Sequence, residues 1–115
     1  MPDLKYFKKS EFVMGNENVY DQMDRIFLET LDELRHLVAM PLKITSSYRS
    51  PSYNKSVGGA SKSMHLQGRA VDIACKNSHD RMIIIAEALS LGLTVGVASS
   101  FLHIDDRDYQ IVFTY

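Results

Sequence analysis

Apolar residues recur at intervals of three and four between residues 18 and 40, which is the spacing of an amphipathic helix. The residues that set this spacing are Val19, Met23, Ile26, Phe27, Leu34, Leu37 and Val38. We expect either Asn16 or Asn18 to cap the start of the helix and Pro41 to end it. Such a helix has to bury its apolar stripe against another element of the fold.

A second helix is predicted over residues 78–91, where Ser78 can serve as the N-cap and Gly92 can close the last turn. A helical turn is expected over residues 53–57. Strands are predicted over residues 42–45, 70–75, 94–98, 101–105 and 109–115. The segments 94–98 and 101–105 read as a hairpin that turns at the two serines between them.

These elements predict an α+β fold in which helices pack on one side of a small, mostly antiparallel sheet. The chain has 115 residues, which is enough for one compact core and too few for two ordinary domains. We therefore expect a single domain over residues 1–115. Its 45% hydrophobic and 23% charged residues are ordinary for a globular protein in water.

The phase of two predicted strands gathers polar side chains on one face of the sheet. In a strand over residues 70–75, Asp72 shares a face with two alanines, while aliphatic residues share the opposite face. In a strand over residues 101–105, His103 and Asp105 share a face in the same way. Two imidazoles and a carboxylate are a common ligand set for catalytic zinc, and His65 lies just before the first of these strands. A metal site fits this layout.

Three motifs carry a resemblance to a known family. The first runs from Ile44 through Arg49 and Asn54 to Ala60, the second is Ser-x-His-x-x-Gly-x-Ala-x-Asp over residues 63–72, and the third is aromatic-x-His-x-Asp over residues 101–105. In this order they resemble the zinc D-Ala-D-Ala carboxypeptidase family. That family includes phage and bacterial peptidoglycan endopeptidases, and its fold is shared with the hedgehog signalling domain. The resemblance covers roughly residues 42–107.

The resemblance implies a hedgehog/DD-peptidase-like fold and a metallopeptidase that cuts an amide bond in the stem or cross-link peptides of peptidoglycan. It implies Zn²⁺ held by His65, Asp72 and His103, with water in the fourth position. Arg49 is implied to hold substrate, and a salt bridge that staples its turn is the alternative. Ser63 is expected either to bind substrate near the metal or to cap its loop. The motifs do not distinguish a carboxypeptidase from an endopeptidase, or D,D from L,D bonds.

One position departs from the family pattern. Many members carry a Glu or Asp three residues before the last zinc histidine, where it acts as general base, but this chain has Ser100 there. Asp105 is the natural substitute because it shares a strand face with His103, although it could instead accept a hydrogen bond that orients the imidazole. Both roles remain open. The rival hypothesis is a catalytically impaired zinc-containing binding module, such as a phage structural or cell-wall-binding protein.

Charge and hydropathy narrow the expected partners. The net charge of −1 gives no reason to expect nucleic acid, and no apolar run approaches the roughly 20 residues that span a bilayer. The first residues lack the apolar region of a signal peptide, so we expect synthesis in the cytoplasm. A phage lytic enzyme released at lysis would reconcile this location with a cell-wall substrate. We expect a monomer that acts on peptidoglycan peptides.

Overall fold

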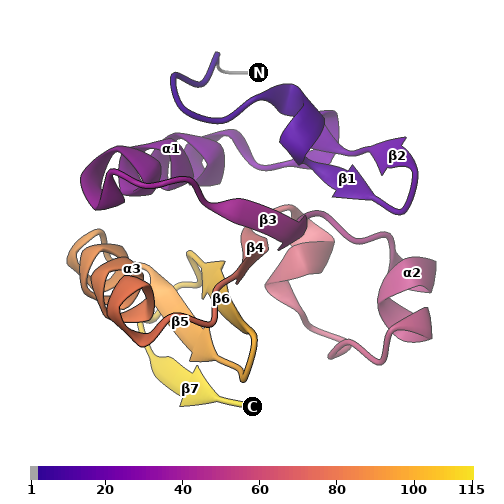
Figure 1. The fold of residues 1–115 in the computed structure, drawn as a ribbon. Coiled ribbons are helices and arrows are strands. Elements are labelled where there is room, and N and C mark those ends of the chain that lie inside the picture. The colour runs from indigo at the N-terminus through magenta and orange to yellow at the C-terminus, as the bar shows by residue number, and fades with distance from the viewer. Residues whose placement is uncertain (1–2) are drawn as a thin grey trace.

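The computed structural model describes residues 3–115, and its main sheet has five strands in the order β3-β4-β6-β5-β7 (Figure 1). These strands are β3 (Lys43–Ser46), β4 (Ala70–Ala74), β5 (Thr94–Val97), β6 (Phe101–Asp105) and β7 (Val112–Thr114). The pairings β3-β4, β4-β6 and β6-β5 are antiparallel, and β7 runs parallel to β5. The predicted α+β fold with a mostly antiparallel sheet is confirmed, as is the hairpin of β5 and β6.

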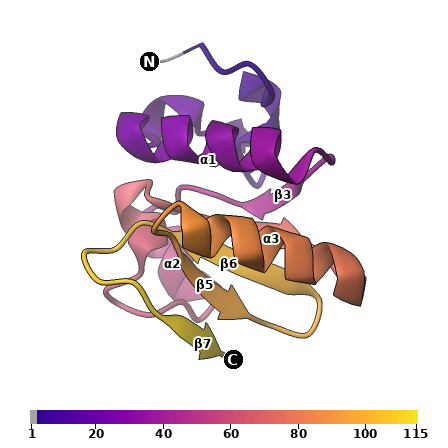
Figure 2. The same ribbon diagram turned by 90° about the vertical axis from the view of Figure 1, so that its left-hand side faces the viewer.

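Helices and short elements complete the fold. They are the helices α1 (Arg25–Val38), α2 (Pro51–Ser56) and α3 (Ser78–Ser90), the 3₁₀ turns η1 (Lys9–Glu11), η2 (Tyr20–Gln22) and η3 (Met64–Gln67), and the small hairpin of β1 (Val13–Met14) and β2 (Glu17–Asn18). In Figure 2, α1 lies above the sheet and α3 lies along β5 and β6. No helix within residues 3–115 combines the length and apolar character needed to cross a membrane.

The first helix starts later than its periodicity predicts. The prediction of a cap at Asn16 or Asn18 is wrong, because the helix begins at Arg25 and Asp24 caps it by accepting the N–H of Phe27 at 2.9 Å. The preceding residues form β2 and η2 instead. The helix ends at Val38, ahead of the expected stop at Pro41.

The second long helix matches its predicted range closely, but its cap lies one residue earlier than predicted. The side chain of Asn77, not Ser78, accepts the N–H of Asp80 at 3.0 Å. Gly92 follows the helix with φ +79°, a conformation that a residue without a side chain adopts at little cost.

The aliphatic face of the sheet forms the core with the two long helices. Val71, Ile73, Leu102 and Ile104 are fully buried, and they join the same cluster as Phe27, Leu28, Leu31 and Leu34 of α1 and Ile84 and Ala88 of α3. Because side chains alternate along a strand, burying this face against α1 and α3 turns the intervening polar residues of β4 and β6 to the other face. The site described below lies on that face.

Candidate metal centre

Three side chains predicted as metal ligands lie together on the polar face of the sheet. Asp72 in β4 is directly paired with His103 in β6, and His65 reaches them from η3. One ligand atom from each residue lies within 4.8 Å of the other two. The three residues are only 2–6% exposed. A buried N, N, O donor set fits zinc, which binds imidazole nitrogens and carboxylate oxygens and leaves a fourth position open in catalytic sites.

Two hydrogen bonds fix the orientation of His65, one at its backbone N–H and one at its ring. Ser63 caps η3, and its hydroxyl accepts the N–H of His65 at 3.2 Å. The Nδ1 atom of His65 lies 2.7 Å from the carbonyl oxygen of Ser47, which can only accept, so Nδ1 carries the proton. The other ring nitrogen, Nε2, faces Oδ1 of Asp72 at 3.2 Å. This geometry supports the capping role of Ser63, and its role in substrate binding stays a prediction.

The imidazole of His103 is held between two carboxylates. Its Nδ1 lies 3.1 Å from Oδ1 of Asp72, and its Nε2 donates to Oδ2 of Asp105 at 2.7 Å. Asp105 thus contacts the nitrogen that does not face Asp72. A hydrogen bond from the outer nitrogen to a carboxylate is the usual way in which a metal-binding histidine is oriented.

Asp105 is a buried and fully bonded carboxylate. It has no exposed surface, and besides His103 it accepts the backbone N–H of Arg107 at 3.0 Å and Nη2 of Arg107 at 2.6 Å. Burial alone would raise the pKa of Asp105, but the hydrogen bonds from His103 and Arg107 hold it well below its usual range. Its contacts support the orienting role more than the general-base role, because its oxygens are bonded to His103 and Arg107 and it does not line the cleft.

Ser100 stands where the family pattern places an acid, and its hydroxyl is a poor general base. Ser100 is exposed in the turn between β5 and β6. Among the described residues, the carboxylates that line the cleft around the site are Asp72 and Asp108, and the side chain of Asp108 is 97% exposed. Asp106, the next carboxylate after Asp105, pairs with Arg69 at 2.7 Å.

The surroundings of His103 favour the protonated form of its ring. Burial tends to raise the pKa of Asp72, but hydrogen bonds with His103 and His65 lower it to about 2, so this carboxylate is ionised at neutral pH. Burial tends to lower the pKa of His103, but hydrogen bonds with Asp105 and Asp72 raise it above its ordinary value of 6.5. Both nitrogens of His103 face carboxylates, which suits the protonated ring.

We predict that zinc binding releases this proton, because Nδ1 of His103 must lose it before the nitrogen can bind a metal. Calorimetric zinc titrations in buffers of different ionisation enthalpy should report proton release from His103, and more of it below its raised pKa than above it. Zinc affinity should rise with pH until the raised pKa of His103 is passed and then level off. Affinity that is independent of pH between 6 and 8, with no proton released, would contradict this assignment.

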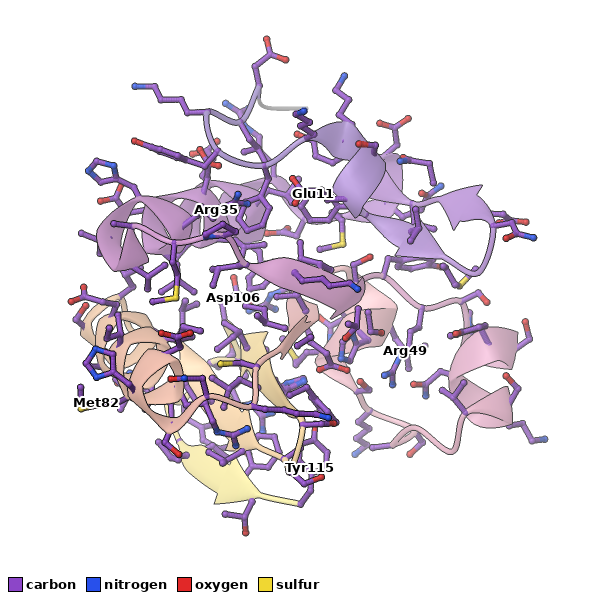
Figure 3. The ribbon with its side chains drawn as sticks, viewed as in Figure 1. Glu11, Arg35, Arg49, Met82, Asp106 and Tyr115 are labelled. Carbon is purple, nitrogen blue, oxygen red and sulfur yellow. The ribbon has the colours of Figure 1, made fainter. Side chains whose placement is uncertain are left out.

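A cleft of about 770 Å³ is lined by the three residues and by Arg49. The Arg49 side chain lies between α2 and the sheet (Figure 3). Its guanidinium donates to Ser46 Oγ at 3.1 Å, to Asn54 Oδ1 at 3.3 Å and to Asp72 Oδ2 at 3.4 Å. These bonds use three of the five N–H donors of an arginine and leave two for another acceptor. The salt bridge with Asp72 connects the turn that carries Arg49 to strand β4. A salt bridge of the kind predicted as the alternative role of Arg49 is therefore present.

Sequence reasoning missed a cluster of aromatic residues that also lines the cleft. Phe113 of β7 lies over Gly96, and its ring centroid is 5.6 Å from that of His103. A Cβ atom on Gly96 would lie only 2.5 Å from Phe113, so the missing side chain makes room for the ring. Tyr115 packs against Phe101 and Phe113 with centroids 5.2 and 5.6 Å away. A glycine inside a strand, which often marks such a close approach, was the available signal.

The fold and this site together are those of a peptidase family. The family model of Peptidase M15 matches residues 5–105, which is most of the chain. The chain therefore belongs to the M15 peptidases, and the resemblance seen over residues 42–107 is confirmed and extends to the N-terminal elements. No curated protein matches the sequence.

Proposed function

We propose that this chain is a zinc-dependent peptidase that hydrolyses an amide bond in the stem or cross-link peptides of peptidoglycan. Its membership of the M15 peptidases supports hydrolysis of a peptide. The observation that carries the proposal is the convergence of His65, Asp72 and His103, whose ligand atoms lie within 4.8 Å of one another and which line one cleft.

Three residues would bind the zinc ion, and a fourth orients one of them. His65 Nε2, Asp72 Oδ1 and His103 Nδ1 would hold the zinc, while Asp105 keeps Nε2 of His103 protonated and turned away from it. When bound, zinc supplies Lewis-acid chemistry: it polarises a carbonyl and lowers the pKa of a water molecule.

Arg49 is the residue proposed to recognise the substrate. Its two unused N–H donors can bind a substrate carbonyl or carboxylate, for which the planar guanidinium is well suited. Its three other N–H groups are already fixed by protein acceptors, so the substrate would meet a cation whose position is set in advance.

We predict that Asp105→Asn weakens zinc binding about 10–100-fold, because the amide is a poorer acceptor for Nε2–H of His103. Added zinc should then restore much of the activity. Asp106→Asn is the matched control, since its carboxylate bonds to Arg69 instead of a proposed ligand. Zinc affinity is measured by competition with a chromogenic chelator. If zinc affinity is unchanged while turnover falls about 10²–10⁴-fold, Asp105 is the general base.

A second candidate function is favoured by one observation. The cleft lacks a positioned acid where many relatives have one, because Ser100 is exposed in a turn and Asp105 is enclosed by His103 and Arg107. A chain of this kind can keep the metal site and the cleft but bind peptidoglycan peptides without cutting them. It would then be a zinc-containing binding module.

One experiment separates these functions. Purified protein is incubated with muropeptides of known cross-linking, with and without a chelator, and the products are identified by mass spectrometry. The peptidase proposal predicts chelator-sensitive cleavage. Loss of a single terminal residue would identify a carboxypeptidase, and separation of cross-linked or internal fragments would identify an endopeptidase. Zinc-dependent binding without cleavage would support the binding module, and neither binding nor cleavage would reject both.

A further inference from the structure

Asn54 is a buried polar residue on a helix that is otherwise at the surface. It is 3% exposed and is the buried residue of α2. Its side-chain Oδ1 accepts Nη1–H of Arg49 at 3.3 Å, and its Nδ2 donates to the carbonyl oxygen of Ala60 at 2.9 Å. An arginine can only donate and a carbonyl can only accept, so these partners fix which end of the amide faces each of them.

The loop that follows α2 is shaped around this amide. A Cβ atom on Gly59 would lie 2.0 Å from Oδ1 of Asn54 and 3.0 Å from Nη1 of Arg49. Gly59, unlike Gly58, does not have a positive φ, so the close approach of the side chains, not the backbone conformation, requires a glycine here. The N–H of Gly59 also donates to the backbone carbonyl of Asn54 at 2.8 Å. The loop, Asn54 and Arg49 are thus packed as one unit.

The contact to Asn54 completes the anchoring of the guanidinium. The other two anchors are Ser46 at Nε and Asp72 at Nη2. Of these, Asp72 is a proposed metal ligand, so its charge would be shared with the ion. Asn54 is neutral and takes no part in the proposed ligand set. It therefore fixes the Nη1 end of Arg49 in the same way with or without metal.

We propose that Asn54 is a positioning residue that acts on substrate through Arg49: its amide holds the guanidinium so that the two unused N–H donors face the cleft. The inference rests on the proposed function, in which Arg49 recognises a substrate carbonyl or carboxylate. The alternative is that Asn54 only stabilises the loop at residues 58–60 through Ala60.

A double-mutant cycle in the full chain separates the two roles. Asn54→Ala should lower kcat/KM about 10–100-fold, the range expected when a substrate-binding group is misplaced by up to about 1 Å. In an Arg49→Ala background, Asn54→Ala should have no further effect. Lys55→Ala, an exposed neighbour on α2, is the control and should leave kcat/KM unchanged. If the effects of Asn54→Ala and Arg49→Ala multiply, the role of Asn54 is structural and the proposal is wrong.

A second variant and a second measurement keep the proposal testable if Asn54→Ala does not fold or if no substrate is found. Gly59→Ala disturbs the contact between Asn54 and Arg49 from the loop side. It should therefore lower kcat/KM as Asn54→Ala does. The mobility of Arg49 Nε–H, measured by ¹⁵N relaxation, needs no substrate. It should increase in Asn54→Ala and stay unchanged in Lys55→Ala.

The two readouts also separate this inference from the proposed function. If the wild-type chain cleaves no peptide but Asn54→Ala frees the Arg49 side chain, the peptidase proposal fails while the anchoring stands. If Arg49 Nε–H is equally ordered in Asn54→Ala and in the wild type, the anchoring fails whatever the activity.

Discussion

His103→Ala should remove bound zinc and abolish cleavage, which is the largest effect we expect from a single substitution. His103 offers one of three nitrogen and oxygen donors that lie within 4.8 Å of one another, and it also connects Asp72 to Asp105. A residue that only hydrogen-bonds a metal-binding side chain typically contributes about 10–100-fold to metal affinity. The loss in zinc affinity on removing His103 should be larger than this. Metal analysis after dialysis, together with a competition titration, measures it.

The control for this substitution is His79→Ala. His79 is exposed in the first turn of α3, so removing it should change neither zinc content nor cleavage. The ligand assignment would be wrong if His103→Ala retained one equivalent of zinc with wild-type affinity.

Arg49→Ala should keep the zinc and nearly the wild-type melting temperature but lose transition-state binding. The expected loss in kcat/KM corresponds to about 2–5 kcal/mol, the cost of truncating one partner of a desolvated charge pair. Arg49→Lys should recover only part of this loss, because a lysine keeps the charge but not the planar arrangement of donors that reaches Ser46, Asn54 and Asp72.

Kinetics on muropeptides and thermal unfolding of the same preparations test this expectation. A variant that melts much earlier, while each folded molecule cleaves at the wild-type rate, would show that Arg49 is a staple for its turn. Zinc content has to be measured in parallel, since Nη2 of Arg49 also contacts Asp72.

The strands of the site were predictable because strand alternation has a short and strict period. A period of two fixes which side chains share a face, so Asp72 and His103 were placed on one side before their pairing was known. The start of α1 was not predictable in this way. Val19 and Met23 are buried, as the periodicity implied, but they flank η2 instead of lying in the helix. Ile26 and Leu37, which belonged to the same predicted stripe, are 71% and 39% exposed. The apolar spacing therefore fixed neither the start of the helix nor every buried position, since a 3₁₀ turn followed by the Asp24 cap can produce the same spacing.

The partners of the predicted site residues depended on tertiary contacts. The pairing of Arg49 with Asn54 depends on how the loop at residues 58–60 folds back, which local pattern does not encode. Arg107 was within reach of sequence reasoning, since it follows Asp105 by two residues and an arginine is a natural partner for a buried carboxylate. The sequence leaves Asp105 with two possible roles, general base or acceptor that orients His103. The bonds from Arg107 to Asp105 favour the orienting role.

Zinc titration of the metal-free protein, with cleavage of a peptidoglycan peptide followed at each step, tests the central claim most directly. The metal-free chain should be inactive, and activity should rise in proportion to added zinc and stop rising at one equivalent per chain. In His103→Ala the same titration should give no activity at any zinc level used. Cleavage at the full rate by metal-free protein would contradict a zinc-dependent peptidase built on His65, Asp72 and His103.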